Sequence, residues 1–332
     1  MERAGKNMKR KITVLTLCAT LFALCDSVDA QQPTKIPRIG FLFIGSKDQP
    51  QVESFRQGLR DLGYVEGKNI VIEYRYAEGK NDALPALAAE FVALNLNVIL
   101  TTTPQASRAV LQATSTVPIV ITGFDPVRIG LAKSLAQPGG NLTGLSSEAG
   151  SEMTGKRLEL LKEAFPSVKI VGLLMNPASE TRESTLDLAK TVAKALGLQI
   201  HPIDVKEGAD IDHSFEPLKK LRVDALHMPA GAIATLNSKR LIAFAAKLGV
   251  PAIYQTTILV EEGGLMAYGV NFGDLYRRAA GYVDKILKGR KPVDLPIEQP
   301  TKFEFIINLK APKQIGLTIP PNVLARADKV IK

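Results

Sequence analysis

Cysteine is almost absent from this sequence of 332 residues, which contains only Cys18 and Cys25. Both lie within the first thirty residues, so the rest of the chain has no disulfide, no thiolate metal site and no cysteine nucleophile. Its stability must come from its apolar core alone, and about 300 residues are enough to bury one. That length predicts two domains of about 150 residues each.

Motifs that would indicate an enzyme are also missing. The sequence has no H-E-x-x-H, and His201, His213 and His227 do not have the spacing of metal ligands. It has no G-x-S-x-G nucleophile elbow, no G-x-x-x-x-G-K-[ST], and no G-x-G-x-x-G after the first predicted strand. We therefore predict no metal, no cofactor and no catalytic residue, and we interpret His227, at the end of a predicted strand, as structural.

Charge and hydropathy argue against two further classes of protein, those that bind nucleic acid and those that span a membrane. The net charge is +9, of which +2 belongs to the first thirty residues, with five basic and three acidic side chains, so the remainder carries +7. Its basic residues alternate with acids, as in Lys156-Arg157-Leu158-Glu159, and none form a cluster with aromatics. Nucleic-acid binding is therefore not predicted. No segment beyond the first thirty residues is apolar enough to cross a membrane.

The first thirty residues have the three parts of a secretory signal peptide. A basic start at Met8-Lys9-Arg10-Lys11 leads into the apolar stretch Ile12 to Leu24, and Val28-Asp29-Ala30 follows. This order predicts a signal over residues 1–30 that is cleaved after Ala30, and hence an exported, periplasmic protein.

Three points about this segment stay open. A retained N-terminal anchor is disfavoured because a permanent span needs about 20 apolar residues. Lipidation at Cys25 is disfavoured because the bulky Leu24 stands where a lipoprotein signal has a small residue. Translation starts at either Met1 or Met8.

After the signal, apolar strands alternate with amphipathic helices. Gln51 to Leu62 has Val52, Phe55 and Leu59 on one helical face, and Gly63 is placed to end the helix. Thr103-Pro104 and Asp125-Pro126 are each typical of a helix start. The strands expected in this half are 38–44, 69–76, 98–101, 118–122 and 142–145. Continuous apolar strands that alternate with helices predict a doubly wound, mostly parallel sheet.

The second half repeats the first. Gly40 and Gly172 are 132 residues apart, Gly63 and Gly197 are 134 apart, and Pro118 and Pro251 are 133 apart. Two similar α/β domains in series explain the near-constant offset, although unrelated α/β domains also place glycine and proline at some of these positions. The tail is too short for a third domain. We expect it to complete both sheets, so that the chain crosses between the domains more than once.

Ligands of open α/β sheets bind at the carboxyl ends of the strands, which in a two-domain chain meet in a cleft. Helices that begin after Thr103, Asp125 and Asn176 would favour a carboxylate there, although each of these side chains is equally explained as a helix cap. Phe124 and Tyr254 would stack on a flat ligand or pack in the core. We interpret Glu261-Glu262-Gly263-Gly264 as a solvated turn.

Several motifs together resemble those of one family of ABC transporter substrate-binding proteins, the family with tryptophan-binding and other aromatic-amino-acid-binding members. They are Leu59-Arg60-Asp61-Leu62-Gly63-Tyr64-Val65-Glu66-Gly67-Lys68-Asn69-Ile70, Asp125-Pro126-Val127, Gln137-Pro138-Gly139-Gly140-Asn141-Leu142-Thr143-Gly144 and Ala267-Tyr268-Gly269-Val270-Asn271. The resemblance covers residues 36–330.

The resemblance implies the type I periplasmic binding protein fold, with two Rossmann-like lobes that a hinge of three crossovers joins. Residues 36–146 with about 271–295 would form lobe 1, and residues 147–270 with about 296–332 would form lobe 2. The pocket positions that the resemblance implies are Ser46, Thr102, Thr103, Phe124, Asp125, Asn176, Tyr254 and Asn271.

The resemblance also implies a function: a monomeric periplasmic receptor that captures a small amino-acid-like or other organic molecule and delivers it to an ABC permease. An exported sensory module and an exported α/β enzyme are the alternatives. Relatives often have a polar or acidic residue where this chain has Pro229-Ala230-Gly231-Ala232, and an acid where it has Gln255-Thr256. These departures argue against recognition of an ammonium group by those two loops.

Overall fold

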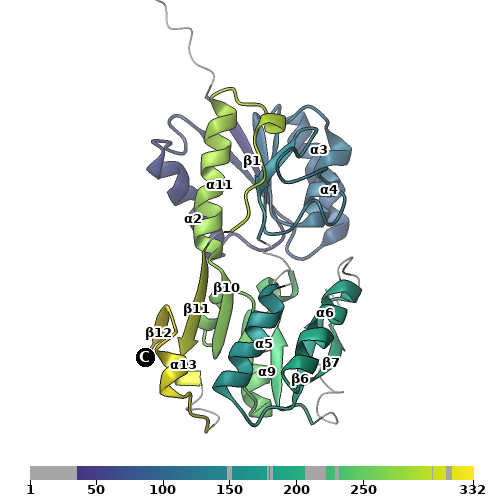
Figure 1. Cartoon of the computed structure of the whole chain (residues 1–332). Helices are drawn as coiled ribbons and strands as arrows, with labels where there is room; N and C mark the ends of the chain where they lie inside the picture. The colour runs from purple at the N-terminus through teal and green to yellow at the C-terminus, as the bar shows by residue number, and fades with distance from the viewer. Residues whose placement is uncertain are drawn as a thin grey trace, which may run out of the picture. The chain divides into compact units, whose positions relative to one another are not determined.

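Figure 1 shows the computed structural model, which describes residues 36–147, 152–177, 179, 182–205, 222–228, 232–300, 302–311 and 316–332. The chain divides into two units, Met1–Ile36 and Pro37–Lys332, and the second contains all the elements below. The predicted signal segment lies outside the described residues. Within those residues, every helix is too short or too polar to cross a bilayer.

The first sheet has five parallel strands in the order β2-β1-β3-β4-β5. Its faces are covered by helices because its strands are apolar on both sides. One core contains Phe41, Phe55 and Tyr276, and the other contains Phe91. The elements are β1 (Arg38–Phe43), α2 (Pro50–Asp61), β2 (Val71–Tyr76), η1 (Asn81–Ala83), α3 (Leu84–Ala93), β3 (Val98–Thr101), α4 (Pro104–Ala113), β4 (Ile119–Thr122) and β5 (Leu142–Leu145).

The second sheet has seven strands in the order β12-β11-β10-β9-β8-β6-β7, and only the β10–β11 pair is antiparallel. Its strands are β6 (Ile170–Met175), β7 (Gln199–Asp204), β8 (Ala225–Met228), β9 (Ala252–Tyr254), β10 (Met266–Val270), β11 (Phe303–Asn308) and β12 (Lys329–Ile331). The helical segments are α5 (Glu152–Ala164), α6 (Arg182–Ala195), α9 (Ala232–Leu248), α10 (Thr257–Glu261), α11 (Phe272–Leu287), η2 (Pro292–Asp294) and α13 (Pro321–Leu324).

The two sheets share one strand order, since β7-β6-β8-β9-β10 repeats β2-β1-β3-β4-β5. Gly40 and Gly172 are the third residues of β1 and β6, the strands next to the β2 and β7 edges of their sheets. A Cβ on either would lie 2.6 Å from a leucine or isoleucine side chain. Pro118 and Pro251 each stand directly before a strand. The predicted fold class, two doubly wound α/β lobes, is confirmed.

The chain passes between the sheets three times. It leaves the first sheet after β5, returns after β10 into α11, and leaves again before β11. The last departure comes after Glu298, whose carbonyl accepts a hydrogen bond from the amide of Ser146 at 2.9 Å. Residues 296–298 therefore still lie beside β5. α11 packs on the first sheet, because Leu275 and Val283 belong to the core around Phe41.

Glycine is required at two of these crossings. A Cβ on Gly269, near the end of β10, would overlap the carbonyl oxygen of Gln255, which follows β9. Gly144 in β5 has the equivalent contact with the carbonyl of Ile121 in β4. Each strand that leads out of a sheet thus approaches its neighbour too closely for any side chain, which fixes where the crossing begins.

Candidate functional site

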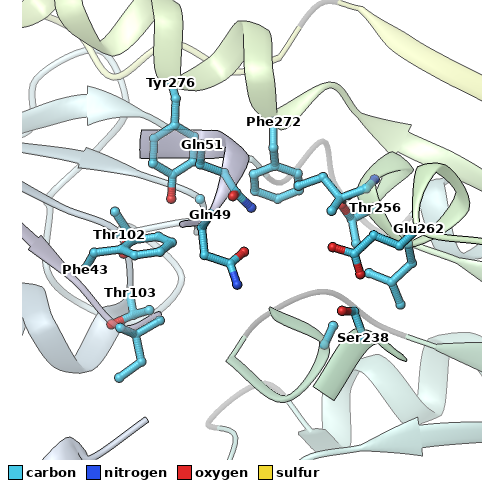
Figure 2. Close-up of a pocket in the computed structure, with 15 residues that line it drawn as sticks. Phe43, Gln49, Gln51, Thr102, Thr103, Ser238, Thr256, Glu262, Phe272 and Tyr276 are labelled. Atoms are coloured by element: carbon cyan, nitrogen blue, oxygen red, sulfur yellow. Dashed lines mark hydrogen bonds between the residues drawn. The ribbon is translucent and has the colours of Figure 1, made fainter. Parts of the chain in front are cut away.

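A pocket open to solvent lies where the strands of the first sheet end, and elements of both sheets line it. Figure 2 shows side chains from the two sides converging on this space, with Gln49 and Phe272 facing Ser238 and Glu262. The described lining residues are Phe43, Ile44, Gln49, Gln51, Thr102, Thr103, Gly123, Ala234, Ser238, Thr256, Ile258, Leu259, Glu262, Phe272 and Tyr276.

Two helices of the first lobe begin at the pocket. α2 starts at Pro50, and its N-cap residue Gln49 makes no side-chain hydrogen bond to the first turn. α4 starts at Pro104, and the hydroxyl of Thr103 accepts a hydrogen bond from the amide of Ala106 at 3.2 Å. Pro50 has no N–H and the amide of Val52 donates to the carbonyl of Gln49 at 3.0 Å, so the start of α2 presents the N–H of Gln51. Both helix dipoles direct positive potential into the pocket.

Buried polar atoms without partners mark the same wall. The Oε1 atom of Gln51 and the Oγ1 atom of Thr102 are buried and make no hydrogen bond, and the hydroxyl of Thr122 nearby is in the same state. Native structures contain few such groups, and each one costs about 1–3 kcal/mol. The free protein retains this cost, which a molecule bound in the pocket would relieve.

This arrangement predicts opposite effects of Thr102→Val on stability and on binding. Valine has the shape of threonine without the unpartnered hydroxyl, so we expect the ligand-free protein to be about 1 kcal/mol more stable to urea. We expect ligand affinity to fall, because a hydrogen bond in the complex is lost. Thr116→Val, outside the pocket, is the control. If Thr102→Val has the same stability and the same ligand affinity as the wild type, the Thr102 hydroxyl does not contact the ligand.

Three aromatic rings form the apolar part of the first-lobe wall. Phe43 ends β1, whereas Phe272 and Tyr276 are one turn apart on α11. The rings of Phe43 and Tyr276 meet edge to face, with centroids 6.4 Å apart. Burial raises the pKa of the Tyr276 hydroxyl to about 12. The phenol therefore stays protonated at neutral pH and remains a hydrogen-bond donor.

The second-lobe wall comes from α9 and α10. Ser238 lies on α9, and the hydroxyl of Thr256 caps α10 by accepting from the amide of Ile258 at 3.4 Å. Ile258 and Leu259 add apolar surface. Glu262 is the C-cap residue of α10.

Glu262 is the only charged residue among the described residues that line the pocket. Figure 2 places its carboxylate in the open space, facing Ser238. The adjacent Glu261 differs, because its carboxylate accepts from Lys329 at 2.9 Å. Glu262 is solvent-exposed, as expected for a residue in a turn. The solvent that it faces fills the pocket. The interpretation of this segment as a solvated turn holds for the exposure of both glutamates, and the structure adds that Glu262 lines the pocket.

The structure brings together two of the eight predicted site residues. Thr102 and Thr103 both line the pocket. Phe124 is 6% exposed in the core beneath α3 and α4, and Tyr254 is 1% exposed in the core of the second lobe. Ser46 belongs to the loop between β1 and α2 but does not line the pocket.

The other three have local structural roles or lie elsewhere. The Asp125 carboxylate accepts from the amides of Val127 and Arg128, and a turn follows it instead of the expected helix. Asn176 does not begin a helix either, since α6 starts at Arg182. Asn271 caps α11 by accepting from the amide of Asp274, and its side chain also donates to Glu304 at 2.9 Å.

The sequence interpretation missed Gln51, Ser238, Glu262, Phe272 and Tyr276. Some signal was present for two of them, because Phe272 directly follows the predicted position Asn271 and Tyr276 lies one helical turn later. Nothing local distinguishes Ser238 from other exposed serines. Its place in the pocket depends on how α9 meets α10.

A buried basic pair lies in the second lobe and is not part of the pocket lining. Arg157 on α5 is 4% exposed and donates from Nε to the carbonyl of Tyr268 at 2.6 Å. Both ring nitrogens of His227 are buried without a partner. Burial, and secondarily the charge of Arg157, lower the pKa of His227 to about 3, so it is neutral at physiological pH. No group of three His, Cys, Asp or Glu suited to a metal occurs among the described residues.

Comparisons with known proteins agree on one family. The model for ABC transporter substrate binding proteins matches residues 45–331. A tyrosine-binding protein of Clostridioides difficile (strain R20291) is 26% identical over 257 residues, which are 77% of this chain and 73% of that protein.

Two solved structures have the same fold. A conserved domain protein from Vibrio cholerae has a TM-score of 0.81 and 30% identity over 89% of this chain and all of that chain. An ABC domain from Streptococcus pneumoniae in complex with L-Trp also has a TM-score of 0.81, with 25% identity over 89% of this chain and 99% of that chain. The fold is that of the type I periplasmic binding proteins. The chain belongs to the family of ABC transporter substrate-binding proteins.

Proposed function

We propose that this protein is the exported solute-binding component of an ABC importer and that its ligand is an amino acid held in the pocket. The observation that carries the proposal is the polarity of the pocket. One wall contains two helix N-termini, and the opposite wall contains the only charged side chain of the described lining, Glu262. A zwitterion has the complementary arrangement of charges.

The carboxylate would lie against the first-lobe wall. The N-terminus of a helix favours an anion because its N–H groups lack partners and its dipole is positive there. At the start of α2 the free backbone donor is the N–H of Gln51, and the unpartnered hydroxyl of Thr102 can also donate to a carboxylate. The unpartnered Oε1 atom of Gln51 only accepts, so it would need a donor group of the ligand. No lysine or arginine is present in the described lining, so backbone groups would supply the recognition.

The ammonium group would lie against Glu262. Its carboxylate has no partner in the described structure other than solvent, unlike that of Glu261. The sequence has no acid at residues 255–256 or 229–232, so the acid would come from Glu262 at the end of α10. The side chain of the ligand would then contact Phe43, Phe272 and Tyr276, and aromatic surfaces of this kind favour a large apolar or aromatic group.

The relatives support this choice of ligand class. One is described as binding tyrosine, and another was solved with L-Trp. Aromatic amino acids are therefore the first candidates for this chain.

Import requires a membrane permease to receive the ligand, and the predicted signal peptide would place the protein in the periplasm. We also propose that the protein acts as a monomer. We propose in addition that it is not an enzyme, since its sequence contains none of the catalytic motifs considered above. A sensory module would use the same pocket and would differ only in its partner. Deletion of the gene would separate the two, because loss of uptake indicates transport whereas loss of a response with intact uptake indicates sensing.

The direct test of the proposal is a thermal-shift screen of the purified protein against the proteinogenic amino acids. A ligand at 100 times its Kd stabilises the folded state by about 2.7 kcal/mol, which raises the melting temperature by several degrees. We expect this rise with one or a few aromatic amino acids. Deaminated and N-acetylated forms of the same molecules are the controls. No shift with any amino acid, or hydrolysis of a compound that binds, would contradict the proposal.

A further inference from the structure

The end of the first lobe that is farthest from the pocket has an unusual surface. The strands of the first sheet end at the pocket, with Phe43 and Thr102 in its lining, so they begin at the opposite end. α2 and α11 also begin at the pocket and pack side by side, with Gly58 of α2 in close contact with Arg277 of α11. Both helices therefore end there too. We call this end, defined below by its residues, the distal face.

Exposed aliphatic side chains lie at two places on the distal face: Leu62 and Val65 precede β2 at one edge of the sheet, whereas Val293 lies beside β5 at the other edge. Only four large hydrophobic side chains among the described residues are well exposed. Three of them lie here: Leu62 (43%) at the end of α2, Val65 (45%) in the following loop, and Val293 (46%) in η2 after α11. The hydroxyl of Tyr64 donates to Asp284 near the end of α11 at 2.9 Å, which holds the loop beside that helix.

Basic side chains are concentrated around Val293 in the sequence, whereas Leu62 and Val65 stand next to Asp61 and Glu66, which pair with Arg277 and Arg56. Residues 284–294 contain four basic and two acidic residues, a net charge of +2. The basic residues are Lys285, Lys288, Arg290 and Lys291, and all are exposed. One of the acids, Asp284, already binds Tyr64 and Lys288. Arg290 and Lys291 form no ion pair with a described residue.

We propose that the distal face docks on an anionic phospholipid surface. Isolated aliphatic side chains set among lysines and arginines suit the interfacial region of a bilayer, where the apolar groups enter the headgroup layer and the cations meet lipid phosphates. Long basic side chains also place their apolar stems against such a surface. Lysine is depleted in the cores of protein–protein interfaces, which favours lipid over a protein partner.

Docking in this way would hold the receptor close to the membrane while the pocket, at the other end of the lobe, stays free for its ligand. Because it depends on a few exposed charges, the interaction would be reversible and sensitive to salt. The proposal is independent of the ligand and of the proposed function.

Co-sedimentation with vesicles tests it. We expect the protein to sediment with phosphatidylcholine vesicles that contain phosphatidylglycerol at low salt, and to stay in solution with phosphatidylcholine alone or at high salt. The triple variant Lys285→Glu, Arg290→Glu, Lys291→Glu should bind vesicles at least tenfold more weakly. Each basic residue near an anionic membrane increases the binding constant about fivefold. Val65→Ser with Val293→Ser should also weaken binding, at unchanged charge.

The matched control is Lys190→Glu, Lys194→Glu, Lys247→Glu, which makes the same charge change on exposed positions of α6 and α9. It should bind vesicles like the wild type. Equal loss in both triple variants would indicate general attraction by the basic protein and would overturn the proposal. So would failure of the wild type to sediment at low salt, or normal vesicle binding by the distal-face triple variant.

Discussion

Glu262→Gln is expected to weaken amino-acid binding about 100-fold while the protein remains folded. Glutamine keeps the shape and the hydrogen-bonding atoms but removes the only formal charge of the described pocket lining. Hydrogen bonds between charged groups contribute about 1.5–3 kcal/mol, and 2.8 kcal/mol corresponds to a factor of about 100 in Kd. Isothermal titration calorimetry of the two proteins measures the difference.

The chain offers a matched control one residue away. Glu261→Gln makes the same chemical change on the same short helix, but its carboxylate pairs with Lys329 outside the pocket. It should leave the affinity unchanged. Equal losses in the two variants would mean that Glu262 acts through the overall charge of this region and not by contact with the ligand.

The second large effect is a loss of stability in mild acid caused by His227. The folded state holds this ring neutral, with a pKa of about 3, whereas the unfolded chain has the ordinary value of about 6.5. Between these two values the unfolded state binds more protons, so stability falls as the pH falls. Each pH unit below 6.5 contributes about 1.4 kcal/mol, or about 2 kcal/mol by pH 5.

His227→Leu should remove this contribution. We expect urea unfolding of the wild type to lose about 2 kcal/mol between pH 6.5 and 5, and the variant to lose correspondingly less. Leucine also removes the two unpartnered ring nitrogens, so the variant should tolerate the change at neutral pH. His201→Leu on β7, outside the apolar core, is the control and should keep the pH dependence of the wild type. The same pH dependence in His227→Leu would show that other groups cause it.

The fold was predictable because its determinants are local and repeated. Val52, Phe55 and Leu59 define the buried face of α2, and Gly63, with φ +86, ends it where the sequence predicts. Thr103-Pro104 begins α4 with the expected cap. The same landmarks recur in the second half at a nearly constant offset, so each lobe supports the interpretation of the other. The family resemblance added the fold class, which the comparisons confirm.

The pocket was harder to predict because capping and ligand binding use the same residue types. Asp125 follows a strand and precedes a proline, as a ligand-binding residue at a helix start would, but its carboxylate is used by the turn that follows. Tyr254 ends a strand at the correct edge of the sheet, but its ring packs against Gly264 in the core. Local sequence does not distinguish these outcomes.

Glu262 shows the opposite difficulty. Two consecutive glutamates before two glycines are typical of a solvated turn, and Glu261 fits that description. Glu262 lines the pocket because the end of α10 lies near Ser238 on α9 and Phe272 on α11, which are separated from it in the chain. Such convergence is a tertiary property, and only the structure reveals it.

The central claim is that the pocket recognises both charges of an amino acid, with Glu262 holding the ammonium group. Calorimetric titration of the purified protein with L-tryptophan, N-acetyl-L-tryptophan and L-tryptophan methyl ester tests this most directly, because the three molecules share the aromatic ring and differ only in the two charged groups. We predict that the zwitterion binds and that loss of either charge weakens binding about 100-fold. N-Acetyl-L-tryptophan binding as tightly as L-tryptophan would contradict the account.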